Sequence, residues 1–331
     1  MITASAPGRC GLVGNPTDMY GGTVISCSTR ERARCTLSYN VDRLMVTVSG
    51  QSRVMQSQSD LALLPGDYLN VARAALSALE IDPAVTAPFH LQADSEIPMQ
   101  AGLAGSTAIL ACLTGALLSH LGLALNPYET AELVRKIEYD VLGIVCGFQD
   151  HTMAVFGGLN CMDFRGKNSA ETQDAKTPFA MVESLVPFVG SLPLVLAHTG
   201  VRHHSGSVHT SPRERWLRGD PEVVGGYTEI GGLARRGKRA LLACDWDTLA
   251  SLMNRNHAIV RDLGGSGEAN ETLIAAALAG GASGAKLAGA GGGGTILALT
   301  HDRDRTVAAL EAAGAEAILF PEPMPGLTVD R

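Results

Sequence analysis

Three glycine-rich segments contain the residues of this chain that are best suited to holding a charged ligand. The first, APGRCGLVGNPTDMYGG at 6–22, places five glycines around one cation, Arg9, and one carboxylate, Asp18. The second, IPMQAGLAGSTAILACLTGALLSH at 97–120, leads from small residues and hydroxyls into an apolar run. The third is KLAGAGGGGTILAL at 286–299. Anion binding is the first chemistry to consider, because glycine allows the backbone to approach a ligand closely.

The second segment has the features of an anion site. Gly102 and Gly105 would let the backbone approach a ligand, and Ser106 and Thr107 would cap the helix that follows. The start of such a helix offers free N–H groups and the positive end of its dipole. Taken alone, the same residues also fit an ordinary capped core helix. The loop contains no lysine and is not a Walker P-loop, so a metal ion and the helix dipole would have to neutralise a bound phosphate.

The third segment matches the pattern G-x-G-x-x-G through Gly289, Gly291 and Gly294. A dinucleotide-binding fingerprint requires the order strand, loop, helix, whereas this loop lies between two predicted strands at 284–289 and 295–300. We therefore interpret it as a tight connection, and an NAD(P)-dependent dehydrogenase is disfavoured. The first segment, taken alone, also fits a turn-rich strand entry with a surface ion pair.

Composition argues against several classes of protein. The 331 residues are 46% apolar and 18% charged, which is a globular composition, and the net charge of −7 argues against a general nucleic-acid binder. The seven cysteines are scattered without a CxxC pair, as expected for reduced thiols and not for a zinc site or a disulfide framework. We expect neither a secretion signal nor a membrane span, and hence a cytoplasmic protein.

Hydrophobic patterning predicts the elements that must position these segments. Strands are predicted at 21–29, 33–39, 44–50, 89–97, 157–164, 192–199, 284–289, 295–300 and 315–320. Helices are predicted at 67–81, from Ser106 onward, at 126–144, over 223–260 with breaks near Gly237 and Asp245, and at 269–281 and 304–314. The helix at 126–144 would have Asn126 as its N-cap and Pro127 at its first position.

The polar, proline-bearing segment at 165–178 is the best candidate for a boundary between two lobes. Helices and strands cluster along the chain and do not alternate strictly, which favours an α+β architecture. We therefore expect an N-terminal lobe at 1–175 and a C-terminal lobe at 176–331.

The order and spacing of the three segments resemble those of the GHMP kinases, which include galactokinase, homoserine kinase, mevalonate kinase and phosphomevalonate kinase. The resemblance covers essentially the whole chain. It implies a two-lobed fold, with an N-terminal lobe like ribosomal protein S5 and a ferredoxin-like α/β C-terminal lobe. GLVGNPTDMYGGTVIS, IPMQAGLAGSTAI, LGIVCGFQDHTMAVFGGLNCMDF and RERWLRGD look most like the glucuronokinase branch, which phosphorylates a sugar acid at its anomeric hydroxyl. HTGVRHHSG is also reminiscent of heptose-phosphate kinases.

The resemblance also implies which residues bind ATP and a metal ion. Those expected to bind ATP are Gly102, Leu103, Ala104, Gly105, Ser106, Thr107, Ala108 and, from the third segment, Gly291. For Mg²⁺ it points to a hydroxyl of Ser106 or Thr107 and to Glu138, and hard oxygen ligands suit this ion. Glu138 also fits an exposed helix carboxylate beside Arg135 and Lys136.

For the chemical step, Asp150 in CGFQDHTMAVFGG matches the catalytic aspartate of the family, which would accept the proton of the acceptor hydroxyl. Arg9 matches its cationic partner. A guanidinium keeps its protons, so Arg9 can only orient Asp150, lower the pKa of the acceptor or stabilise developing charge. A plain helix N-cap is the alternative role for Asp150.

Acceptor binding is expected to involve the first segment and one or more cations. Asp18 matches a position that binds sugar hydroxyls, and Asn15 is expected on the same substrate side, although the pair Asn15–Pro16 departs from the galactokinase pattern and weakens a galactose assignment. The cations that could bind the carboxylate of a sugar acid are Arg213 and Arg215, or Arg202 with His203 and His204. The same residues also fit a solvated polar loop.

The expected function is that of an ATP- and Mg²⁺-dependent kinase acting on a hydroxyl of a sugar or sugar acid, with the anomeric hydroxyl preferred. Alternatives within the fold are kinases of mevalonate or of a heptose phosphate. A non-catalytic sensor of sugar and nucleotide is disfavoured, because Asp150, Arg9 and Glu138 are all present. We expect a small-molecule substrate, no nucleic-acid or membrane partner, and a monomer or homodimer.

Overall fold

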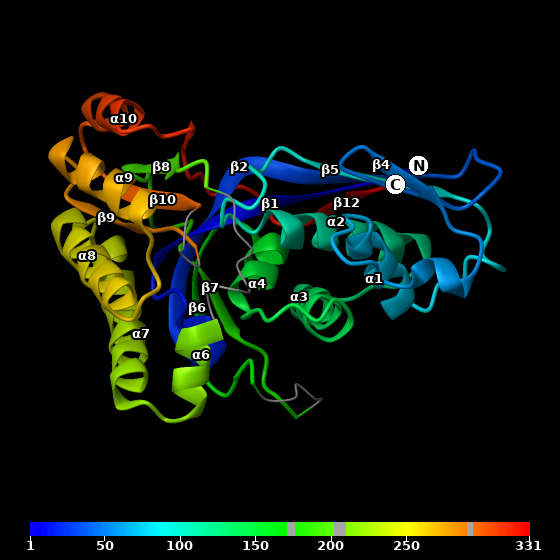
Figure 1. Ribbon diagram of the computed structural model, residues 1–331, viewed down its shortest axis with the longest axis horizontal. Helices are drawn as coiled ribbons and strands as arrows, with labels where there is room; N and C mark the ends of the chain where they lie inside the picture. The colour runs from blue at the N-terminus through cyan, green and yellow to red at the C-terminus, as the bar shows by residue number, and fades with distance from the viewer. Residues whose placement is uncertain (171–175, 202–209, 290–293) are drawn as a thin grey trace.

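The chain forms two sheets with helices packed against them (Figure 1), and the computed structural model describes residues 1–170, 176–201, 210–289 and 294–331. The first sheet has eight strands in the order β12-β1-β2-β5-β3-β4, with β6 and β7 attached through β2. Its strands are β1 Ile2–Val13, β2 Thr23–Ser38, β3 Met45–Val48, β4 Gln51–Val54, β5 His90–Ser95, β6 Leu159–Asp163, β7 Met181–Ser184 and β12 Thr328–Asp330. Strand β2 pairs with β6 through residues 23–27 and with β5 through residues 33–38, so one long strand joins both parts of the sheet.

Four helices lie together on one face of the first sheet (Figure 1): α1 Asn70–Ala78, α2 Gly105–His120, α3 Pro127–Lys136 and α4 Gln149–Phe156. Helix α2 is apolar on nearly all sides because it contacts β1 and β2 as well as α1, α3 and α4. Asn126 is the N-cap of α3, as predicted, and its Oδ1 accepts hydrogen bonds from the N–H groups of Tyr128 and Glu129. The helix predicted at 126–144 ends at Lys136 and is followed by a π-helical turn, Ile137–Val141.

The second sheet has four antiparallel strands in the order β11-β8-β10-β9. They are β8 Leu194–His198, β9 Gly284–Leu287, β10 Thr295–Leu299 and β11 Ala317–Leu319. The helices of this half are α6 Thr210–Leu217, α7 Pro221–Leu242, α8 Trp246–Asp262, α9 Glu268–Ala279 and α10 Arg303–Ala312. Helices α7 and α8 run side by side (Figure 1) and carry the chain from α6 to α9.

The long helical region predicted at 223–260 is broken at only one of its two predicted points. Asp245 ends the connection between α7 and α8, and its side chain caps α8 by accepting from the N–H of Thr248. Helix α7 runs through Gly237 without a break. This glycine lies against β1, and a Cβ atom on it would come within 2.7 Å of Val13 Cγ1, so its role is close packing and not helix termination.

The two sheets do not divide the chain at a single point. Strand β7, which follows residue 175, pairs with β6. Strand β12 at the C-terminal end pairs with β1, so the two termini lie close together (Figure 1). The α+β architecture is confirmed. The division at residue 175 stays a prediction, and two strands from beyond it belong to the first sheet. In the described part of the chain, no helix combines the length and the apolar composition that crossing a bilayer requires.

Candidate active site

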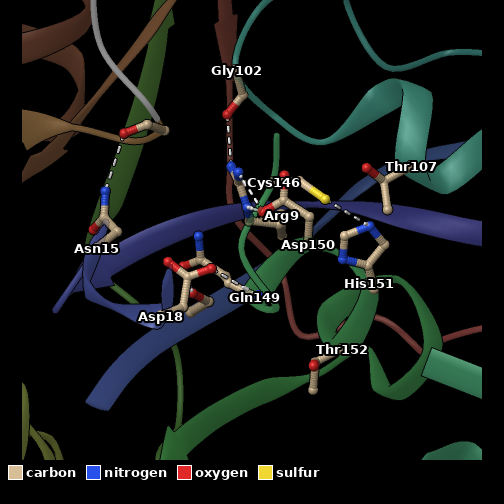
Figure 2. A network of polar contacts seen from close by, with 12 residues as sticks. Arg9, Asn15, Asp18, Gly102, Thr107, Cys146, Gln149, Asp150, His151 and Thr152 are labelled. Carbon is tan, nitrogen blue, oxygen red and sulfur yellow. Dashed lines mark hydrogen bonds and ion pairs between the residues drawn. The ribbon is translucent and has the colours of Figure 1, made fainter. Parts of the chain in front are cut away.

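Arg9 connects the predicted catalytic carboxylate to the second glycine-rich segment. It lies on β1, and its side chain is buried. Its Nε donates to Asp150 Oδ1 at 2.8 Å, its Nη2 lies 2.7 Å from the same oxygen, and its Nη1 donates to the carbonyl oxygen of Gly102 at 2.6 Å (Figure 2). One guanidinium therefore fixes both a carboxylate and the loop that precedes α2, which agrees with an orienting role for Arg9.

Asp150 lies in the first turn of α4, but it is not the cap of that helix. The capping role belongs to Asp18, whose Oδ2 accepts from the N–H groups of Phe148 at 2.9 Å and Gln149 at 3.0 Å. Asp18 comes from the 3-10 turn η1, Thr17–Tyr20, so the first glycine-rich segment holds the start of α4. Asp150 therefore does not act as the N-cap of α4, which was the alternative role considered for it. A Cβ atom on Gly147 would collide with Asp18 Oδ2, which explains the glycine at that position.

The Asp18 carboxyl is almost fully buried. Burial raises its pKa, the neighbouring Asp150 carboxylate raises it further, and the hydrogen bonds from the two backbone N–H groups oppose these effects. One oxygen of Asp18 is engaged by α4, so a sugar hydroxyl would have to bind at the other oxygen.

The loop before α2 has the backbone conformation that an anion site needs. Gly102 and Ala104 both have positive φ values, of 73° and 60°, and α2 begins directly afterwards at Gly105. The N–H groups of residues 105–107 have no carbonyl partner within the helix, because its first i→i−4 bond runs from Ala108 to Ala104. Leu103, Ala104 and Ala108 are buried, so any contact they make with phosphate would be through the backbone. Ser106 is exposed at this helix end.

All three glycine-rich segments meet at this loop. The N–H of Arg9 donates to the carbonyl of Leu103 at 3.1 Å, and the N–H of Gly11 donates to that of Ala288 at 2.9 Å. A Cβ atom on Gly289 would collide with the carbonyl oxygen of Gly102. The third segment joins the antiparallel strands β9 and β10, which confirms that it is not a dinucleotide fingerprint. Gly291 lies outside the described residues.

Glu138 is buried, so its interpretation as an exposed helix carboxylate is wrong. It lies in the π-helical turn after α3, and its Oε2 accepts from Thr107 Oγ1 at 2.9 Å and contacts His151 Nε2 at 2.7 Å. The sequence-predicted metal residues Thr107 and Glu138 are thus in direct contact. Cys146 Sγ lies 3.9 Å from His151 Nε2 (Figure 2), and Glu138, Cys146 and His151 place their ligand atoms within 4.8 Å of one another. Neither Cys146 nor His151 is predicted as a site residue from the sequence, although His151 directly follows Asp150.

The residues predicted to bind the acceptor differ in what their side chains contact. Asn15 is buried, donating through Nδ2 to the carbonyl of Gly289 at 3.2 Å and accepting through Oδ1 from Lys286 Nζ at 2.7 Å. Arg215 is paired with Asp220, 2.7 Å from its Nε, and with Glu222. Both side chains are therefore already occupied by protein groups.

Arg213 differs from Arg215 because its Nε is buried and has no hydrogen-bond partner among the described residues. It lies close enough to Tyr20, in the turn that carries Asp18, to oppose the rise in the pKa of Tyr20 that burial causes. The Tyr20 ring stacks on Tyr227 at 4.7 Å between centroids and contacts Trp216 of α6 at 4.8 Å. The other cations considered for a substrate carboxylate, Arg202, His203 and His204, lie outside the described residues.

Comparisons with known proteins agree with this geometry. The chain matches the model of the GHMP kinases N terminal domain over residues 69–158 and that of the GHMP kinases C terminal region over residues 238–318. It is also 35% identical over 303 residues to Glucuronokinase 1 of Arabidopsis thaliana, which spans 86% of this chain and 81% of that protein. The chain belongs to the GHMP kinase family.

Other relatives of this GHMP kinase act on different acceptors. The mevalonate kinase of Thermococcus sibiricus is 27% identical and covers 99% of this chain and 98% of its own. Among solved structures, a D-glycero-D-manno-heptose 1-phosphate kinase from Bacteroides thetaiotaomicron superposes with a TM-score of 0.75 at 22% identity, over 100% of this chain and 99% of that one, which bears on the fold alone. As a GHMP kinase the chain is an ATP-dependent phosphotransferase with an alcohol group as acceptor.

Proposed function

We propose that this GHMP kinase phosphorylates a sugar acid, with the anomeric hydroxyl of a uronate as the acceptor. The observation that best supports an acidic acceptor is the buried Nε–H of Arg213, which has no partner among the described residues and lies near the turn that carries Asp18. A buried donor without a partner is costly, and a substrate carboxylate would satisfy it. The 35% identity to Glucuronokinase 1 supports the same acceptor.

In the proposed reaction, the N–H groups of residues 105–107 and the positive end of the α2 dipole bind the phosphates of ATP. Asp150 accepts the proton of the acceptor hydroxyl as the new O–P bond forms and the bond to the bridging oxygen of ADP breaks. Both close contacts from Arg9 are made to Asp150 Oδ1, so Oδ2 is the oxygen to which the hydroxyl would donate. Arg9 holds the carboxylate in place and adds positive charge beside the phosphate loop.

The residues around Glu138 fit a divalent cation. Thr107 and Glu138 provide hard oxygen donors in contact with each other, and Ser106 adds an exposed hydroxyl at the same helix end. We propose that these three residues hold Mg²⁺, with His151 orienting the Glu138 carboxylate through Oε2, the oxygen that Thr107 also contacts. Mg²⁺, when bound, would neutralise part of the charge on the phosphates.

A panel of acceptors tests this proposal. With ATP and Mg²⁺, kcat/KM should be highest for D-glucuronate or D-galacturonate and lower for galactose, heptose 7-phosphate and mevalonate. Arg213→Ala should raise KM for the uronates by about 10-fold or more and leave KM for neutral sugars nearly unchanged, since only the acids have a carboxylate to lose its partner. Arg215→Ala is the matched control and should change neither KM for the uronates nor KM for the neutral sugars.

Mevalonate is the second candidate acceptor, because the likeness to mevalonate kinases covers nearly the whole chain and mevalonate also has a carboxylate that Arg213 could bind. Turnover with mevalonate and with none of the sugars would contradict the sugar-acid proposal. It would leave the assignment to the kinase family intact.

A further inference from the structure

Lys286 is a fully buried cation at the place where the first and third glycine-rich segments meet. It lies on β9 and is only 1% exposed. Its Nζ donates to the carbonyl of Gly11 at 3.1 Å, to Asn15 Oδ1 at 2.7 Å and to the carbonyl of Leu287 at 2.5 Å. All three acceptors are uncharged oxygens. An ammonium group buried in this way is costly, so its presence calls for a role beyond filling space.

The contacts of Lys286 join the first segment to the third, and the third lies against the phosphate loop. Asn15 accepts from Lys286 and donates to Gly289, whose backbone lies directly against Gly102. Asn15 also precedes Asp18, which caps α4 beside Asp150. Lys286 therefore holds the acceptor-side turn and the third segment in a fixed relation to the loop that would bind phosphate.

We propose that Lys286 is a positioning residue for phosphoryl transfer, and that its ammonium form sets the placement of the acceptor-side turn against the phosphate loop. This inference rests on the proposed kinase function. An ammonium group has three N–H donors and can satisfy all three oxygens, whereas a neutral amine has two donors and a lone pair. Loss of the proton leaves one acceptor unpaired and turns a lone pair towards it.

The surroundings of Lys286 make this change accessible near neutral pH. Burial is the main cause that lowers its pKa, Cys10 opposes the shift and Arg9 adds to it, and together they bring the pKa to about 7. His257 on α8 also interacts with the lysine electrostatically, and burial keeps the pKa of that histidine low. The charged form of Lys286 is present below a pH of about 7 and is lost above it. Its contribution to activity is therefore expected to disappear on the alkaline side.

The pH dependence of kcat/KM for the uronate tests the inference. In the wild type, kcat/KM should fall on the alkaline side with a midpoint near pH 7, by about tenfold per pH unit. Lys286→Arg should remove this fall, because a guanidinium stays charged throughout. Asn15→Asp, which supplies a carboxylate partner, should move the midpoint to higher pH. Lys238→Arg is the matched control, since that ammonium is already paired with Glu183, and it should leave the profile unchanged.

A second measurement does not depend on activity. The chain has only five lysines, so the ¹³Cε resonances of isotope-labelled lysine can be followed during a pH titration of the whole protein. One resonance should titrate near pH 7 and be absent from Lys286→Met, a variant that should also lower kcat/KM by about 10- to 100-fold below pH 7 and approach the wild type on the alkaline side. A merely structural role predicts lower melting temperatures in the variants and an unchanged alkaline fall in Lys286→Arg and Asn15→Asp. That result would overturn the inference alone, whereas a wild type without phosphoryl transfer would overturn the proposed function as well.

Discussion

Asp18 holds the helix turn that carries Asp150. The carboxyl oxygen Oδ2 of Asp18 accepts from the two N–H groups directly before Asp150, at 2.9 and 3.0 Å, while Arg9 donates to the Asp150 carboxylate at 2.8 Å. The first glycine-rich segment thus contributes both to the support of the α4 terminus and to the orientation of the proposed base. We therefore expect its residues to affect catalysis through geometry as well as through any contact with the acceptor.

Replacement of Asp18 should therefore affect stability as well as acceptor binding. Asp18→Ala removes two hydrogen bonds to backbone N–H groups and should lower the free energy of unfolding by about 1–3 kcal/mol. It should also raise KM for the acceptor more than KM for ATP. Chemical denaturation together with steady-state kinetics would measure both effects. A variant with wild-type stability would contradict the capping role.

The pH dependence of stability should change in Asp18→Asn. Burial raises the pKa of Asp18 in the folded chain, so the folded state keeps this proton to a higher pH than the unfolded state, where the ordinary value is 3.8. The Asp18 contribution to the free energy of unfolding therefore falls as pH rises from 3.8 through the folded-state pKa. The asparagine variant cannot ionise, and its stability relative to the wild type should increase over that interval. A constant difference across it would show that the carboxyl titrates normally.

Asp150→Asn should separate chemistry from nucleotide binding. Loss of the proton acceptor should reduce kcat by about 10²-fold or more, while the Kd for an ATP analogue changes little, because the phosphates are held by the backbone. Asp94→Asn, on the exposed surface of β5, provides a control for a general loss of carboxylate charge. A kcat close to that of the wild type would show that Asp150 is not the base.

The requirement for a divalent cation should depend on Glu138. Removal of the cation with a chelator should abolish phosphoryl transfer, and added Mg²⁺ should restore it. Glu138→Gln should raise the Mg²⁺ concentration for half-maximal activity by about tenfold or more, because a charged oxygen donor is lost. Thr107→Ser keeps the hydroxyl that contacts Glu138 and serves as the conservative comparison for Thr107→Val. An unchanged Mg²⁺ requirement in Glu138→Gln would place the metal elsewhere.

Local patterns in the sequence predicted much of the fold and the centre of the site. The cap at Asn126, the break at Asp245 and the non-helical context of the third glycine segment all depend on neighbours in the chain, and the structure confirms them. The resemblance of the motifs pointed to Arg9, Asp150 and the loop at 102–108, and the structure places Arg9 in contact with both Asp150 and Gly102. Helices α4 and α6 and the strands β1, β4, β7 and β12 were not predicted. Most of these segments are short and polar or contain glycine and small residues, so they gain their structure from pairing and packing and carry little periodicity of their own.

Residues that act through distant contacts could not be found from the sequence. Lys286 and Asn15 are 271 positions apart, and nothing near either residue in the chain indicates that they share a hydrogen bond. The burial of Glu138 follows from contacts with Thr107 and His151 on two other helices, although the pattern around it was that of an exposed helix face. The distinction between Arg213 and Arg215 likewise depends on Asp220 and Glu222, which pair with only one of them.

A crystal structure with a non-hydrolysable ATP analogue, Mg²⁺ and D-glucuronate would test the account most directly. We predict that the terminal phosphates contact the N–H groups of residues 105–107 and that Asp150 Oδ2 lies within hydrogen-bond distance of the sugar hydroxyl nearest the γ-phosphate. Nucleotide bound elsewhere, with the α2 terminus making no phosphate contact and Asp150 facing away from the sugar, would contradict it.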